Sequence, residues 1–155
     1  MNRFFLIISF VTLVLFSTHS FSNANQSHSP IKMDIGRPGD ADEVSRIIKL
    51  TQVDNMFLPS GFTVSEGETI RLVIKNGGNN KHEMLMGSMP ELKKAAKMRR
   101  IFPDMSQPEA HLIQLEPGEQ KELIWRFNGS GIVDFACPLP GHFKKMRGKI
   151  TVEKK

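Results

Sequence analysis

The sequence predicts an all-β protein, a Greek-key β-sandwich with one helical insertion at about residues 89–101. Short segments rich in β-branched and aliphatic residues recur along the chain, and turns rich in Gly, Pro and Asn separate them. Residues 69–75 alternate apolar and polar side chains, as a strand buried on one face does. Predicted strands do not alternate with long predicted helices along the sequence. A β-sandwich is therefore favoured over a parallel βαβ fold.

The N-terminus has the pattern of a secretory signal peptide over residues 1–24. Arg3 supplies a positive charge, residues 4–16 form an apolar run, and Ser22 and Ala24 occupy the cleavage-determining positions. A membrane anchor is the alternative, but an apolar run of 13 residues is too short to span a bilayer as a helix. We therefore expect export to the periplasm, with no membrane span after cleavage.

The rest of the chain suffices for a single domain. Residues 25–45 are polar and are expected to be a flexible lead-in, with the domain itself at 46–155. Cleavage would lower the formal net charge from +5 to +4, because Arg3 is the only charge in the leader. This modest positive charge fits an anionic partner or simple solubility. Aromatic residues do not interleave with the basic ones, which argues against a nucleic-acid partner.

The strands are predicted from alternation and from β-branched content. Strands or extended segments are expected at residues 46–53, 69–75, 111–115, 120–128, 132–137 and 148–153, with turns at 66–68, 76–80, 116–119 and 128–131. Residues 54–64 are expected to be a turn-rich crossing followed by extended chain. Residues 120–128 place Leu123, Trp125 and Phe127 on one face. In the same way, residues 132–137 place Cys137 on the inward face.

A single α-helix is predicted between these strands. Ser88 and Glu91 form a capping box, in which Ser88 is the N-cap and Glu91 the third helical residue. The helix is expected to run to about Arg100 and to pack through Leu92, Ala95, Ala96 and Met98. Pro103 and Pro108 end it.

The only cysteine, Cys137, begins a segment rich in soft metal ligands. His142 follows five residues later, and Met146 follows four residues after that. Exported chains usually pair their cysteines in disulfides, so a lone cysteine must have a different role. With a second imidazole, these side chains form the His2Cys set with a weak axial Met that is typical of blue-copper sites.

Cys137 also has alternative roles that the sequence leaves open. A free cysteine can be an inert buried residue, a reactive thiol or half of an intermolecular bridge. A catalytic nucleophile is disfavoured, because no orienting partner or oxyanion donor accompanies the Cys/His pair. Zinc would accept the thiolate and the imidazoles but would gain nothing from Met146. We expect no enzymatic activity, since neither an open coordination position nor a second metal cluster is evident.

Two stretches of the chain resemble the cupredoxins, the family of plastocyanin- and azurin-like type 1 blue-copper proteins. Residues 134–142, followed by 146–152, resemble the C-terminal signature of that family, and residues 57–76 are similar to its second and third strands. The resemblance implies one type 1 copper ion as cofactor, with the ligands His82, Cys137, His142 and Met146. His28 and His111 are interpreted as ordinary surface or hydrogen-bonded histidines.

The resemblance implies one-electron transfer by Cu(II)/Cu(I) cycling, in a monomer that exchanges electrons with a redox protein such as a cytochrome or oxidase. The alternative is the periplasmic copper-tolerance branch, in which the protein would sequester or handle excess copper. A cluster of methionines beside His82 is the feature that favours this alternative.

Two further groups of residues have a functional and a structural interpretation. Met84, Met86 and Met89 could form an auxiliary Cu(I) site, because thioethers are soft ligands, but packing is favoured, because Met commonly fills irregular gaps. Lys144 and Lys145 flank the copper loop and could guide an acidic partner. A solvated loop accounts for these two lysines equally well.

Overall fold

The computed structural model describes residues 34–103 and 108–155, which belong to one compact unit, Lys32–Lys155. The predicted signal peptide at 1–24, and the lead-in up to residue 33, lie outside the described residues. Within the described part of the chain, no helix is both long and apolar enough to cross a membrane.

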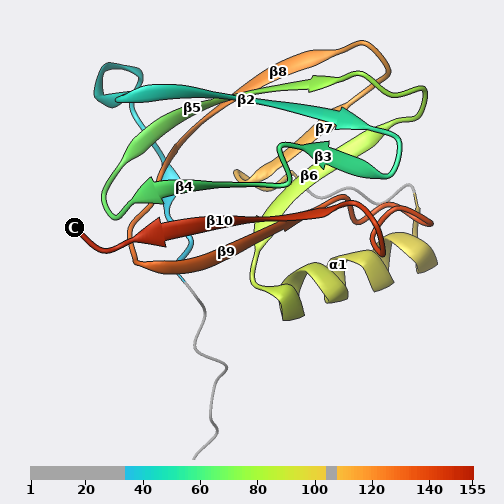
Figure 1. The fold of residues 1–155 in the computed structure, drawn as a ribbon. Coiled ribbons are helices and arrows are strands. Elements are labelled where there is room, and N and C mark those ends of the chain that lie inside the picture. The colour runs from blue at the N-terminus through green and yellow to red at the C-terminus, as the bar shows by residue number, and fades with distance from the viewer. Residues whose placement is uncertain (1–33, 104–107) are drawn as a thin grey trace, which may run out of the picture. The chain divides into compact units, whose positions relative to one another are not determined.

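Two five-stranded sheets form the fold (Figure 1), with the strand orders β1-β8-β5-β2-β3 and β4-β10-β9-β6-β7. The first sheet contains β1 (Arg37–Pro38), β8 (Gln120–Arg126), β5 (Thr69–Asn76), β2 (Arg46–Val53) and β3 (Met56–Leu58). The second contains β4 (Gly61–Ser65), β10 (Arg147–Glu153), β9 (Gly131–Ala136), β6 (His82–Gly87) and β7 (Leu112–Leu115). The predicted all-β sandwich with one helical insertion is confirmed.

The core lies between the sheets and is built from the faces that alternation predicted. Ile70, Leu72 and Ile74 of β5 are each 0 % exposed, and Trp125 of the neighbouring strand β8 is also buried. From the other sheet, Phe135 packs edge-on against Phe57 with ring centroids 5.0 Å apart. Burial of these large apolar side chains is the main favourable contribution to folding.

The end of the expected lead-in is part of the sandwich. Residues 34–45, predicted to be flexible from their polar composition, contain β1 and a short 3-10 helix, η1 (Ala41–Glu43). β1 pairs antiparallel with β8, and the indole N–H of Trp125 donates a hydrogen bond of 2.9 Å to the Ile35 carbonyl. Backbone pairing with β8 holds these residues in place. Amino-acid composition alone does not reveal such pairing, so the prediction of a flexible segment was wrong for residues 34–45.

The predicted helix is α1 (Met89–Ile101), and both halves of its capping box are present. Leu92 is 0 % exposed and packs with Leu85 and Ala136 against the outer side of the second sheet. Phe143, in the loop between β9 and β10, joins the same small cluster. The helix therefore packs against both β6 and the segment that follows Cys137.

The side chains of β6 alternate between the main core and the outer face of the sheet that carries α1. Met84 and Met86 point into the main core. Leu85 packs toward α1, and the Glu83 carboxylate accepts a hydrogen bond of 3.2 Å from Arg99 of that helix. By the same alternation, His82 lies on the inward face at the first position of the strand.

Candidate metal centre

Three predicted ligands meet at one end of the sandwich. The donor atoms of His82, Cys137 and His142 all lie within 4.8 Å of one another. The two Nδ1 atoms of His82 and His142 are 3.2 Å apart, and Cys137 Sγ is 3.4 Å from His142 Nδ1. Two donors that bind one ion at about 2.0–2.3 Å, the bond lengths of imidazole and thiolate ligands to zinc, have separations of this order.

Strand pairing explains why residues so distant in sequence meet here. β6 and β9 are antiparallel neighbours, and Leu85 is paired with Ala136. His82 begins β6 and Cys137 directly follows β9, so both residues reach the same end of the sheet. The Glu83 N–H lies 3.4 Å from Cys137 Sγ and donates a hydrogen bond to it.

The loop from Cys137 to Met146 is closed by its own backbone. The Cys137 N–H donates to the Met146 carbonyl at 3.0 Å, and the Met146 N–H donates to the His142 carbonyl at 2.9 Å. Gly141 has a φ of 83°, a left-handed conformation that costs glycine little. Met146 is 0 % exposed and belongs to the same buried cluster as Cys137. The predicted thioether is thus placed at the same end of the core as the thiol.

Asn76, at the end of β5, organises the loop before His82. Its side-chain amide donates to the carbonyls of Asn80 at 2.8 Å and Leu115 at 3.1 Å, and its oxygen accepts from the Gly78 N–H at 2.9 Å. This fully buried side chain supplies hydrogen-bond partners to backbone groups that have none within the loop itself. It therefore fixes the entry of the chain into His82.

Sequence reasoning missed Asp54, which contacts the outer nitrogen of His82. Asp54 Oδ1 is 3.0 Å from His82 Nε2. Hydrogen bonds from the Asn79 backbone, and then from Asn80 and His82, lower the pKa of Asp54 to about 2. No local pattern identifies it, because Asp54 follows β2 and reaches His82 only through the parallel pairing of β2 with β5, whose end carries the loop to His82.

The thiol is buried, and its protonation follows from that burial. Burial raises the pKa of Cys137 to about 11, although N–H groups of Glu83 and Leu139 act in the opposite direction. The thiol therefore carries its proton at neutral pH, and a metal that binds as a thiolate complex must release it. Burial also lowers the pKa of His142, and His82 adds to this effect, which favours the neutral imidazole, the form that binds a metal.

The donor chemistry fits copper. A thiolate with two imidazoles and a nearby thioether is the set that copper takes in electron-transfer sites, whereas structural zinc sites use four Cys, His or carboxylate ligands. Among the described residues, no other group of three or more His, Cys, Asp or Glu side chains could hold a metal ion.

The methionines proposed for an auxiliary site have different surroundings. Met84 and Met86 are each 1 % exposed and lie in the main core among apolar side chains. Met89 begins α1 and lines a separate cavity with Ser60 and Arg147. This placement favours packing as the role of Met84 and Met86.

The two predicted docking lysines are exposed at the loop that carries His142. Lys144 also lines a groove of about 360 Å³ between α1 and this loop. The other basic residues of the groove are Lys93, Lys97 and Arg100, and Pro138, Leu139 and Phe143 supply apolar surface.

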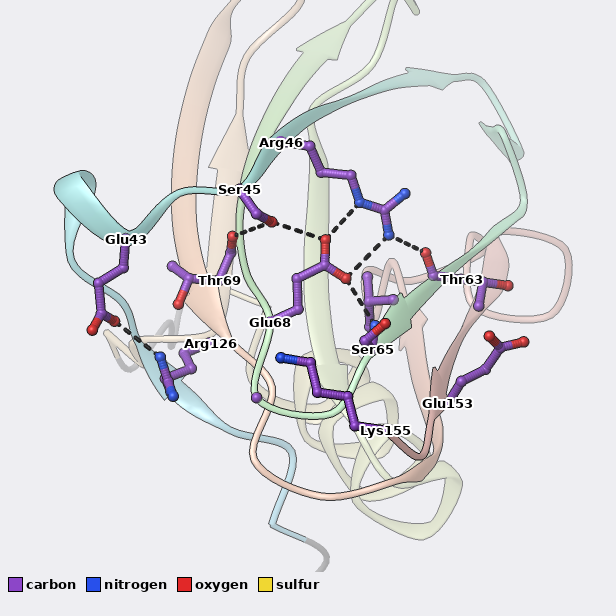
Figure 2. Close-up of a pocket in the computed structure, with 12 residues that line it drawn as sticks. Glu43, Ser45, Arg46, Thr63, Ser65, Glu68, Thr69, Arg126, Glu153 and Lys155 are labelled. Atoms are coloured by element: carbon purple, nitrogen blue, oxygen red, sulfur yellow. Dashed lines mark hydrogen bonds and ion pairs between the residues drawn. The ribbon is translucent and has the colours of Figure 1, made fainter.

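A larger cavity of about 680 Å³ lies at the opposite end of the strands (Figure 2). It is bordered by the start of β2, the end of β4 and the start of β5, and its side chains form ion pairs such as Arg46–Glu68. Among the residues that the structure describes, no histidine or cysteine lines it. It is therefore separate from the metal centre.

Comparison with known proteins gives relatives by sequence and neighbours by structure, while no protein-family model matches the chain. A copper-resistant cuproprotein CopI of Rubrivivax gelatinosus is 37 % identical over 138 residues, covering 88 % of this chain and 81 % of the relative. A protein of the same name from Vibrio cholerae is 26 % identical, covering 80 % of this chain and 82 % of the relative.

Solved structures with this fold include several auracyanins, of which auracyanin A of Chloroflexus aurantiacus is described as a "blue" copper protein. Auracyanin B superimposes with a TM-score of 0.65 at 16 % identity, covering 76 % of this chain and 96 % of its own. The reduced auracyanin of Roseiflexus castenholzii superimposes with a TM-score of 0.61 at 21 % identity, covering 71 % of this chain and 98 % of the auracyanin chain. At these identities the likeness shows the cupredoxin fold, in agreement with the sequence-based expectation.

Proposed function

Because the chain belongs to the family of copper-resistant cuproproteins named CopI, we propose that it binds one copper ion and protects the cell by handling excess copper in the periplasm. The observation that carries the proposal is the convergence of His82, Cys137 and His142 on one point. Export through the predicted signal peptide would place the protein in the compartment where incoming copper is met first.

Each residue of the centre has its own role in binding the ion. Cys137 supplies a thiolate after it loses its proton, and the Glu83 N–H stabilises the sulfur by a hydrogen bond. His82 and His142 turn their Nδ1 atoms to the same point, and Met146 supplies the thioether of the set. Copper held by such ligands can be kept as Cu(II) or Cu(I), since the mixed nitrogen and sulfur donors suit both moderately.

A growth test addresses the physiological role. A strain that lacks the gene should be sensitive to added copper, and the wild-type gene should restore tolerance. Cys137→Ser and His82→Ala should fail to restore it, because each removes one ligand. His111→Ala is the matched control, since that imidazole pairs with Glu109 and stands apart from the centre. Full tolerance with Cys137→Ser would contradict the proposal.

Electron transfer is the second candidate, and the exposure of His142 favours it. This ligand is only partly buried and lies on the loop beside the basic groove, where an acidic cytochrome or oxidase could dock. Deletion would then reduce a respiratory or oxidase activity without causing copper sensitivity. Charge reversal in Lys144→Glu/Lys145→Glu would slow electron transfer to the partner at low salt, and the difference would shrink as salt screens the charges. Rates that do not depend on ionic strength would rule out this docking.

A further inference from the structure

The imidazole of His82 is contacted at both of its nitrogens. Nδ1 faces His142 at 3.2 Å, and Nε2 faces Asp54 Oδ1 at 3.0 Å. A neutral imidazole has one N–H donor and one acceptor nitrogen. A carboxylate can only accept, so its contact with Nε2 favours the tautomer with the proton on Nε2. The lone pair of Nδ1 is then directed toward Cys137 and His142.

The carboxylate is itself held in place before any metal binds. The Asn79 N–H lies 3.2 Å from each Asp54 oxygen, and the Asn80 N–H lies 3.3 Å from Oδ1. Gly78 packs directly over this contact, since a Cβ there would lie 2.5 Å from Asp54 Oδ1 and 3.0 Å from His82 Nε2. The loop thus clamps the carboxylate against the imidazole and leaves no room for a side chain between them.

We propose that Asp54 is a positioning residue of the copper centre, which fixes the tautomer of His82 and shifts the preference of the site toward Cu(II). The inference rests on the proposed copper binding. A carboxylate that accepts the outer N–H of a metal-bound histidine raises the basicity of the ligand, and its loss typically costs 10- to 100-fold in metal affinity. The added negative charge favours the more highly charged oxidation state.

Two substitutions separate this role from simple bracing of the loop. Asp54→Asn removes the charge but keeps an oxygen that can accept from the same N–H groups, whereas Asp54→Ala removes both. Glu122→Gln is the control, because it removes an equal charge from a carboxylate that pairs with Arg71. Thermal unfolding of the metal-free variants shows whether each of them folds.

The first measurement uses the metal-free protein. Long-range ¹H–¹⁵N NMR of the histidine rings should show His82 with its proton on Nε2 in the wild type and in Glu122→Gln. Asp54→Ala should shift the ring toward the other tautomer or to a mixture of the two. An unchanged Nε2–H tautomer in Asp54→Ala would overturn the positioning role.

The second measurement uses copper-loaded protein. Competition with a Cu(II) chelator should show about a tenfold loss of Cu(II) affinity in Asp54→Asn, the low end of the usual range, because the Asp54 side chain is 31 % exposed. If Cu(I) affinity is unchanged, the reduction potential rises by about 59 mV for a tenfold loss. An unchanged potential in a copper-loaded variant overturns this inference alone. A wild-type protein that binds no copper overturns the proposed function and this inference with it.

Discussion

At the scale of single residues, Glu83 links the metal centre to the helix. Its N–H donates to Cys137 Sγ, and its carboxylate accepts hydrogen bonds from Arg99 at 3.2 Å and Gln114 at 2.8 Å. The side chains of Glu83 and Arg99 are 2 % and 9 % exposed. Removing two charges from water is costly, so this pair is tolerated only because both partners are present.

We therefore expect Arg99→Leu to destabilise the protein by about 3–5 kcal/mol, because Glu83 would remain buried without its counter-charge. Urea unfolding of the metal-free protein measures the change. The double variant Glu83→Gln/Arg99→Leu should recover most of the loss, since neither member of the pair then carries a charge. A loss of less than about 1 kcal/mol in Arg99→Leu would show that water solvates the carboxylate there.

At the scale of elements, α1 is the insertion that packs against the segment bearing the ligands. Its start follows from the capping box of Ser88 and Glu91, in which the Ser88 N–H donates to the Glu91 carboxylate at 2.9 Å. Leu92 then anchors the helix against Leu85 of β6 and Ala136 of β9. These two strands carry His82 and lead to Cys137, so the helix stabilises the part of the sheet that presents the ligands.

Leu92→Ala should lower the free energy of unfolding by about 2–5 kcal/mol, because it leaves a cavity at a fully buried position. The neighbouring Lys93→Ala should change it by no more than about 0.5 kcal/mol, since Lys93 is exposed. Chemical unfolding of both variants measures the difference. Equal stabilities would mean that the helix is not anchored through Leu92.

The bounds of the strands and the helix show how much of the structure can be predicted from the sequence. The strand expected at 46–53 is β2 with the same bounds, and α1 ends within a residue of the expected Arg100. Such elements depend on local alternation and capping, which a single sequence displays. The Asp54–His82 contact joins residues 28 positions apart and requires β2 to lie beside β5, and the Glu83–Arg99 pair joins residues 16 positions apart and requires α1 to pack against β6.

At the scale of the whole described unit, the two ends of the sandwich differ in chemistry. One end holds the ligand-bearing loops, and the other holds a network around Glu68 (Figure 2). Glu68 accepts from Arg46 Nε at 2.7 Å, from the Ser65 N–H at 2.8 Å and from Ser45 Oγ at 2.9 Å. Burial alone would raise the pKa of Glu68, but these hydrogen bonds outweigh burial and lower it below 4.5.

This network gives a pH dependence of stability. Because the pKa of Glu68 is lower in the folded protein than in the unfolded chain, its contribution is fully present above about pH 4.5 and is lost as the pH falls through the folded value. Glu68→Gln should cost about 1 kcal/mol at pH 7, a small figure because Arg46 is 48 % exposed. The difference from the wild type should vanish in acid. A difference that persists unchanged at low pH would contradict this expectation.

The central claim is that Cys137, His82 and His142 hold one copper ion. Its most direct test is a titration of the purified protein with Cu(II), followed by visible absorption. We expect an intense thiolate-to-copper band that saturates at one equivalent and is absent in Cys137→Ser. A titration that produces no such band, or the same spectrum in Cys137→Ser, would contradict the claim.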